Sequence, residues 1–167
     1  YCMFWGYSSM RCFQSVVTPS IMEFYIGMGQ QRDVATRIEP KYYFLRGLLS
    51  VKYYVQRKPV EKGKSNEMPG FEKIDETEDF IIYENKNYLP MGFAYDTYMT
   101  EDEFKALSTQ NKTAALLDSL VISPEQYEKD SDIITKRTRS MNNSPQLYET
   151  LCNEKRAQSC YYFKEDN

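Results

Sequence analysis

The sequence contains no histidine in its 167 residues. This absence removes Ser-His-Asp and Cys-His catalysis, and with them the side chain that most often acts as a base at neutral pH. The glycine-rich patterns GxGxxG and GxxxxGKS/T, which hold nucleotide phosphates, are absent as well. The sequence therefore predicts no catalytic residue and no cofactor.

Cysteine is scarce, and its spacing does not suit a metal site. Cys2, Cys12, Cys152 and Cys160 form no CxxC pair, and no histidine is available to complete a typical zinc site. On one continuous helix Cys152 and Cys160 would lie about 12 Å apart, too far for a disulfide. They could pair only if the helix ended between them, and free thiols are the alternative. We expect no bound metal.

Long hydrophobic runs are also missing. No window of about 18 apolar residues occurs, so no segment is predicted to span a membrane. No signal peptide is present, and the chain opens at Tyr1 amid apolar residues, which predicts a piece of a larger protein. A net charge of −3 argues against a nucleic-acid partner. The one basic cluster falls in a predicted loop and consists of Arg57, Lys58, Lys62 and Lys64.

The composition is that of a folded domain. Hydrophobic residues make up 41% of the chain, aromatic residues 15% and charged residues of both signs 27%. These proportions supply both a core and a solvated surface at this length. We therefore expect residues 1–167 to form a single domain.

The apolar patterning predicts an α+β fold with one sheet of about four strands, largely antiparallel or mixed, and helices packed on it. Aromatic and β-branched runs predict strands at 51–55, 71–75, 80–84 and 92–98, with a hairpin turn at 76–79. Helices are predicted to begin near residues 18, 39, 100, 123 and 144, and a further helical stripe covers 114–121. Capping-box spacing occurs at Ser20–Glu23 and at Thr100–Glu103.

Acidic residues offer two weak candidates for a site. Asp130 and Asp132 have the D-x-D spacing with which some glycosyltransferases hold a metal, but a solvated helix end explains them better. The carboxylates at 101–103 suit helix capping better than glycosidase chemistry.

The fifteen tyrosines are the remaining candidates. Tyr53 and Tyr54 are neighbours on a predicted strand, so they point to opposite faces and cannot both enter the core. An exposed tyrosine beside the polar loop 84–87 could stack on a sugar ring, although core packing is the commoner fate of tyrosine. The residues predicted to bind a ligand are Tyr53, Tyr54, Tyr83, Asn85, Asn87 and Tyr88.

Four stretches of the sequence resemble one family. They are WGYSS at 5–9 with FQS at 13–15, LRGLLSVKY at 45–53, YENKNYLPMGF at 83–93, and EKRA at 154–157 with Cys160. They cover most of the chain from residue 5 to 163, and the two middle stretches are the most specific. On these residues the chain resembles the bacterial YfhO-type multi-pass membrane proteins.

The resemblance implies a membrane glycosyltransferase of Gram-positive type that uses lipid-linked sugars and modifies cell-envelope polymers such as lipoteichoic acid. Its catalytic acidic residues are expected next to transmembrane helices, outside these stretches. The resemblance thus implies an extracytoplasmic domain, tethered by transmembrane segments outside this chain. Its expected partners are the remainder of the parent membrane protein and an envelope glycan or teichoic acid.

Three roles stay open at this point. The chain could be a non-catalytic accessory domain that positions an acceptor polymer, a carbohydrate- or ligand-binding module, or a structural or oligomerisation domain. An independent hydrolase is a more distant alternative.

Overall fold

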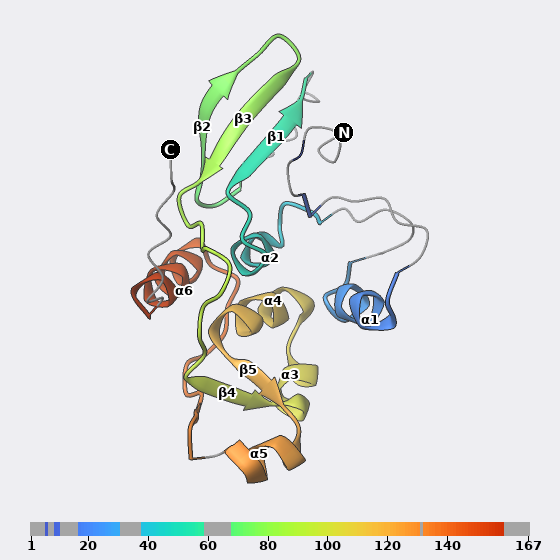
Figure 1. Cartoon of the computed structure of the whole chain (residues 1–167), viewed down its shortest axis with the longest axis vertical. Helices are drawn as coiled ribbons and strands as arrows, with labels where there is room; N and C mark the ends of the chain where they lie inside the picture. Colours follow the sequence, from blue (N-terminus) through green and yellow to red (C-terminus); the bar gives the residue numbers. More distant parts are fainter. Residues whose placement is uncertain are drawn as a thin grey trace.

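The computed structural model describes residues 6, 9–10, 17–30, 38–58, 68–130 and 132–158. An antiparallel sheet lies at one end of the long axis of the molecule, and helices with a second small sheet make up the rest (Figure 1). The predicted mixed α+β class is confirmed. The helices are α1 Pro19–Gly27, α2 Tyr43–Leu48, α3 Glu101–Ala106, α4 Thr109–Asp118, α5 Pro124–Asp130 and α6 Pro145–Gln158, and the strands are β1 Tyr53–Arg57, β2 Phe71–Glu76, β3 Phe80–Asn85, β4 Thr97–Thr100, β5 Leu120–Ile122 and β6 Thr135–Lys136.

The first sheet has the order β1-β3-β2 and is antiparallel throughout. Its three strands match the predictions at 51–55, 71–75 and 80–84. The predicted turn at 76–79 is confirmed as well, because the Thr77 amide donates to the Phe80 carbonyl at 2.8 Å and the Thr77 hydroxyl accepts from the Phe80 amide at 3.1 Å. Antiparallel strands joined by a short turn need no crossover, so local residues suffice to form the β2–β3 hairpin, whereas β1 pairs with β3 from more than twenty residues earlier in the chain.

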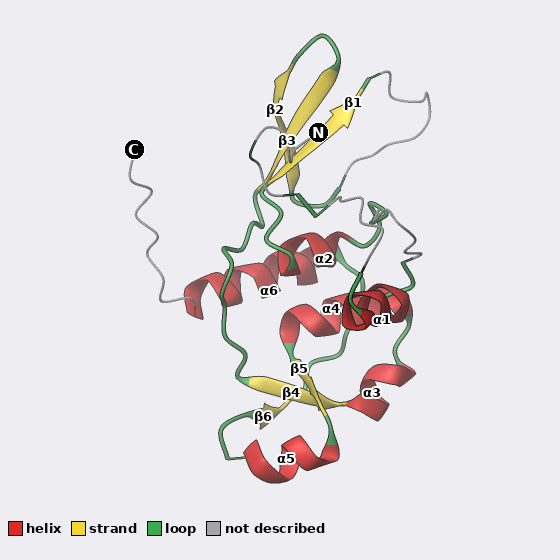
Figure 2. Cartoon of the chain, turned by 45° about the vertical axis from the view of Figure 1, so that its right-hand side comes forward, coloured by secondary structure: helices red, strands yellow, loops and turns green. Residues whose placement is uncertain are grey.

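The second sheet corrects the prediction of one sheet with about four strands. Here β4 lies between β5 and β6 and is parallel to both (Figure 2). The helices α3 and α4 make the crossover from β4 to β5, as parallel pairing requires. The described strands therefore form two three-stranded sheets.

Two predicted elements change where this second sheet forms. The strand expected at 92–98 is paired only from Thr97, and in the preceding residues the Ala94 carbonyl accepts from Lys155 while the Tyr95 hydroxyl donates to the Leu116 carbonyl at 2.6 Å. The helix expected to run to residue 121 ends at Asp118, and the next residues enter β5. A three-residue parallel strand has too little length to show a period of its own.

Helix starts were predicted correctly where the cap is local. Thr100 and Glu103 form the complete capping box, with both reciprocal hydrogen bonds present. Helices α5 and α6 also begin at the predicted prolines. The capping box predicted at Ser20 is wrong, since α1 begins at Pro19 with Thr18 as its uncapped N-cap residue. The helix expected from residue 39 begins at Tyr43, after a turn.

The main core lies between α2, α4 and α6. Phe44 and Tyr148 are fully buried there, with ring centroids 5.1 Å apart, and Leu117 and Leu151 pack around them. The close approach of α2 to α6 depends on Gly47. A Cβ at this position would lie 2.9 Å from Cε2 of Tyr148. A smaller cluster joins α1 to α2 through Tyr25, Met28, Ile38, Tyr42 and Leu45.

The C-terminal half of α6 holds the segment that connects the two sheets, residues 86–96. Arg156 donates to the Lys86 carbonyl at 3.3 Å, at the end of this segment nearest β3. Lys155 donates to the Ala94 carbonyl at 3.2 Å and Gln158 to the Asp96 carboxylate at 2.9 Å, at the end nearest β4. One helix therefore sets the position of both sheets.

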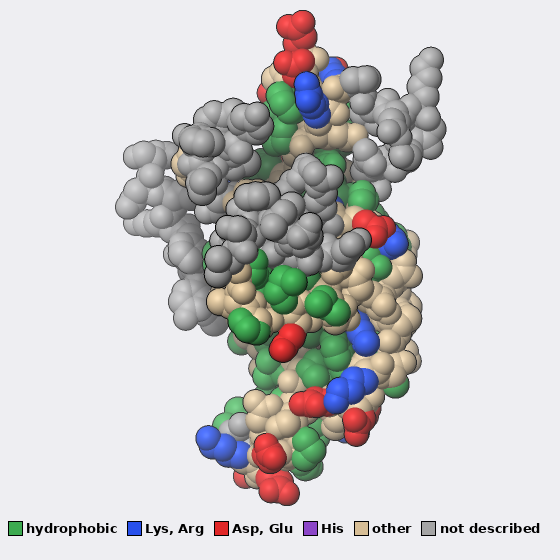
Figure 3. Space-filling view, turned by 90° about the vertical axis from the view of Figure 1, so that its right-hand side faces the viewer, with side chains coloured by type: hydrophobic (Ala, Val, Ile, Leu, Met, Phe, Trp, Pro, Cys, Tyr) green, Lys and Arg blue, Asp and Glu red, His purple; other side chains and the backbone are tan. Residues whose placement is uncertain are grey.

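The described surface mixes charges of both signs. On the face shown in Figure 3, acidic and basic side chains lie side by side at both ends of the molecule. On α3, Lys105 and Glu101 are a typical pair, one helical turn apart and 3.0 Å from each other. Exposed pairs of this kind contribute little stability individually.

Candidate functional site

The six residues predicted to bind a ligand lie where β1 begins and β3 ends. Tyr53 is opposite Glu84, and Tyr54 is opposite Tyr83. Residues directly opposite each other on antiparallel strands project to the same face, and successive residues alternate between faces. The sheet therefore separates Tyr53 from Tyr54 and Tyr83.

Tyr53 lies on the open face of the sheet, with 51% of its surface exposed. The ammonium group of Lys52 is 5.4 Å from the centroid of the Tyr53 ring and 5.8 Å from that of Tyr88. Both distances fall in the range of cation–π contacts. Lys52 thus links two of the predicted tyrosines into one surface, which we call the tyrosine–lysine patch (Lys52, Tyr53 and Tyr88).

Charged groups border the tyrosine–lysine patch. The ammonium group of Lys86 is 2.6 Å from the Glu84 carboxylate and 3.8 Å from that of Glu72. The hydrogen bond from Lys86 lowers the pKa of Glu84, and the charge of Lys52 lowers it further. The same bond raises the pKa of Lys86. Both groups are therefore charged at neutral pH, and they offer donors and acceptors beside an aromatic face.

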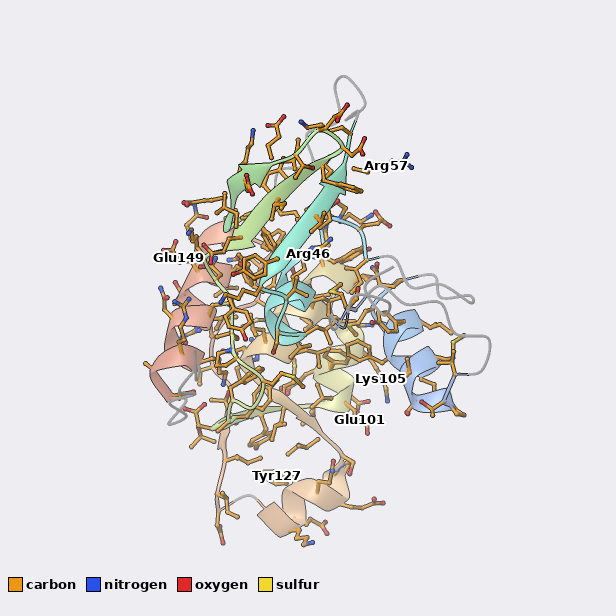
Figure 4. The ribbon with its side chains drawn as sticks, turned by 45° about the horizontal axis from the view of Figure 1, so that its top comes forward. Arg46, Arg57, Glu101, Lys105, Tyr127 and Glu149 are labelled. Carbon is orange, nitrogen blue, oxygen red and sulfur yellow. The ribbon has the colours of Figure 1, made fainter. Side chains whose placement is uncertain are left out.

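The opposite face of the sheet carries Tyr54 and Tyr83, whose ring centroids are 6.1 Å apart. The guanidinium of Arg46 is 5.4 Å from the Tyr54 centroid and donates to the Ile38 carbonyl at 3.0 Å. Figure 4 shows Arg46 between α2 and β1. Burial lowers the pKa of Arg46. This half of the predicted set packs against the body of the protein.

Asn85 and Asn87 belong to the junction between the sheet and the helices. The Asn85 amide nitrogen donates to the Val51 carbonyl at 3.0 Å and to the Tyr148 hydroxyl at 3.3 Å, and its amide oxygen accepts from the Asn87 backbone at 3.0 Å. Asn87 fits against Gly70, whose φ of +79° favours glycine. A Cβ on Gly70 would lie 2.5 Å from the Asn87 amide nitrogen. These contacts give both asparagines a structural role.

A second polar cluster was not predicted from the sequence. Lys155 is 3% exposed, and its ammonium group lies 4.6 Å from the Tyr95 ring centroid and 4.0 Å from the Asp96 carboxylate. Burial lowers the pKa of Lys155. The sequence did contain a signal for the burial of Lys155. This residue comes seven positions after Tyr148 and four after Leu151, so it lies on the apolar stripe of α6.

The same cluster includes a salt bridge at its rim. Arg139 binds both carboxylate oxygens of Glu154, at 2.8 and 2.9 Å, and lies 3.5 Å from the buried Asp118. Hydrogen bonding to Glu154 raises the pKa of Arg139. These contacts anchor the segment at 137–139 to α6, which is a structural arrangement.

Other predicted features can be placed only in part. Within the described residues, no group of three acidic or cysteine side chains could hold a metal ion. Asp132 lies in a turn, and Ser131 of the D-x-D stretch lies outside the described residues. Cys152 is a buried free thiol, and Cys2, Cys12 and Cys160 lie outside the described residues. Lys62 and Lys64 also lie outside them.

Comparison with known proteins now adds to this geometry. The family model described as "Bacterial membrane protein YfhO" matches residues 2–167. The chain belongs to this family. One relative is the protein of Bacillus subtilis (strain 168) named "Uncharacterized protein YfhO", which is 29% identical over 143 residues. The match covers 79% of this chain and 16% of that protein, so the chain spans about a sixth of the length of its relative.

No solved structure matches the chain. Among the described helices, none has the length and apolar character needed to cross a lipid bilayer. The family is one of bacterial membrane proteins, which agrees with the resemblance inferred from the four sequence stretches. Two of these stretches contain Gly47, at the contact of α2 with α6, and Asn85, at the junction between the sheet and the helices.

Proposed function

We propose that this chain is a non-catalytic extracytoplasmic domain of a membrane glycosyltransferase, and that it holds a cell-envelope polymer such as lipoteichoic acid for modification by the rest of the protein. Membership of the membrane-protein family supports the tethered setting. The chain covers a small share of its relative, which leaves room for a catalytic region outside it. The remainder of the parent protein is then its permanent partner.

The tyrosine–lysine patch carries this proposal. Sugar rings pack their apolar faces on exposed aromatic rings, and Tyr53 offers such a ring on the open face of the sheet. Lys52 sits between the two tyrosines, where a cation can also meet the phosphate groups of a teichoic acid. Glu84 and Lys86 lie beside it as hydrogen-bonding groups for hydroxyls. The patch thus combines the three features that an anionic, sugar-bearing polymer requires.

The test is a titration of the 167-residue chain with deacylated lipoteichoic acid, followed by NMR chemical-shift changes. We expect weak binding, with a dissociation constant on the order of 1 mM for a short chain, because the surface is open and small. Tyr53→Ala should weaken binding about threefold to tenfold, the loss expected for one aromatic contact.

Tyr127→Ala is the matched control, because Tyr127 is a similarly exposed tyrosine on α5. This variant should bind like the unmodified chain. Shifts that avoid Tyr53 and Tyr88, or equal losses in both variants, would refute the role of the patch. Turnover of a glycosyl donor or of a glycoside by the chain alone would refute its non-catalytic character.

A further inference from the structure

The two outer strands of the first sheet differ in how they meet solvent. β2 carries exposed charged residues at 72, 73, 75 and 76, and its pairing with β3 shifts between Lys73 and Asp75. Charges and a bulge on an edge strand discourage further pairing. β1 is regular over its whole length and exposes Tyr53 and Val55, the latter by 56%. Within the described residues, β1 is therefore the edge without these protections.

The backbone hydrogen bonds show which groups of β1 point away from the sheet. The Lys52 carbonyl accepts from the Asn85 amide at 2.8 Å, and the Lys58 amide donates to the Asp79 carbonyl at 2.7 Å. These bonds direct the backbone groups of even-numbered residues toward β3. Because the direction alternates along an antiparallel strand, the amides and carbonyls of Tyr53, Val55 and Arg57 point outward.

We propose that β1 pairs with β1 of a second copy of this chain, antiparallel and centred on Val55, to form a continuous six-stranded sheet. In this register Val55 lies opposite its own symmetry mate, and Tyr53 lies opposite Arg57 of the other copy. All three residues have outward backbone groups, so each can exchange hydrogen bonds across the axis.

The side chains suit this register. Val55 places a β-branched side chain at the twofold axis. On each side of the axis, the ring of Tyr53 from one copy lies opposite the guanidinium of Arg57 from the other copy, so the pair occurs twice. Arg57 is exposed at the far end of β1 and points away from the sheet (Figure 4). A parallel arrangement or a shift by one residue would lose these pairs. The self-complementarity selects a second copy of the chain as the occupant of this edge.

The pairing has a consequence for ligand display, although it does not depend on the proposed function. A twofold axis between antiparallel strands stands perpendicular to the sheet, so both tyrosine–lysine patches lie on the same face. Two sites on one face can engage two units of a repeating polymer, which raises the overall affinity without any new contact.

Sedimentation equilibrium of the 167-residue chain tests the pairing. Two five-residue strands form a small interface, so we expect a monomer–dimer equilibrium with a dissociation constant of about 10 μM to 1 mM. Val55→Lys places two ammonium groups at the axis and should weaken the dimer at least about tenfold. Ile74→Lys is the matched control, because Ile74 is an exposed aliphatic residue on β2. It should leave association unchanged.

A cross-linking experiment tests the register itself. Val55→Cys should form a covalent dimer on mild oxidation, because paired residues on antiparallel strands lie within disulfide range. Ile74→Cys, with the same native cysteines, should not exceed the background of the unmodified chain. A chain that stays monomeric at about 1 mM would overturn the proposal. Equal weakening by Val55→Lys and Ile74→Lys, or equal cross-linking by the two cysteine variants, would do the same.

Discussion

Gly47 provides the sharpest test of the packing between α2 and α6. A Cβ there would lie 2.9 Å from Cε2 and 3.1 Å from the hydroxyl oxygen of Tyr148, and 3.3 Å from Sγ of Cys152. Tyr148 has no exposed surface and packs against Tyr43 and Phe44, so it has no free direction in which to move. Overpacking of this kind costs about 1–3 kcal/mol.

Helix propensity works in the opposite direction. Replacing glycine by alanine inside a helix gains roughly 0.5–1 kcal/mol, and less near a helix end. Gly47 is the fifth of the six residues of α2, so the gain is small. We therefore expect Gly47→Ala to lower the free energy of unfolding by about 1–2 kcal/mol. At a urea m-value of about 2 kcal/mol/M, the midpoint falls by about 0.5–1 M.

Far-UV circular dichroism against urea measures this change. Gly27→Ala is the control, since Gly27 closes α1 and a Cβ there would meet no atom within 4 Å. It should leave the midpoint unchanged or raise it slightly. If Gly47→Ala proved as stable as the unmodified chain, the close approach of the two helices would not limit the core, and our account of this junction would be wrong.

Three further predictions concern caps and titrating groups. Thr100→Ala should lower the free energy of unfolding by about 1 kcal/mol, whereas Ser20→Ala, which removes no helix cap, should change it little; equal effects would contradict the assigned caps. The hydrogen bond from Lys136 and the backbone bond from Thr100 hold the pKa of Glu103 at about 2. The contribution of ionised Glu103 to the free energy of unfolding is therefore complete above pH 4.5 and disappears as the pH falls toward 2. Glu103→Gln, which keeps the cap, should flatten unfolding free energy against pH in that range, and an unchanged slope would count against the ion pair. Burial raises the pKa of the Cys152 thiol to about 12, so peptide mapping should find Cys152 alkylated by iodoacetamide only after unfolding, and rapid labelling of the native chain would show that the site opens.

Sequence reasoning succeeded where structure depends on neighbours along the chain. Thr100 and Glu103 cap α3 because the two side chains need only each other and the local backbone. Strands β2 and β3 form a hairpin for the same reason. The end of α4 was not predictable in this way. Leu120 and Val121 suit a helix stripe and a buried strand equally, and the choice depends on pairing with Tyr98 and Met99, about twenty positions earlier.

The candidate site shows the same division. The strand pattern predicted that Tyr53 and Tyr54 would point to opposite faces, and the register confirms it. The pattern could not tell which face would stay open, because that depends on Arg46 from α2. The buried position of Lys155 also depends on a distant segment, at Ala94.

The residues that join α6 to residues 86–96 come last in the described sequence. Every strand of the antiparallel sheet lies before residue 86, and every strand of the parallel sheet lies before residue 137. The groups that join the two sheets, on Lys155, Arg156 and Gln158, follow at the end of the described residues. A truncation before residue 155 would therefore keep all the strand residues of both sheets and remove the three side chains that hold the segment between them.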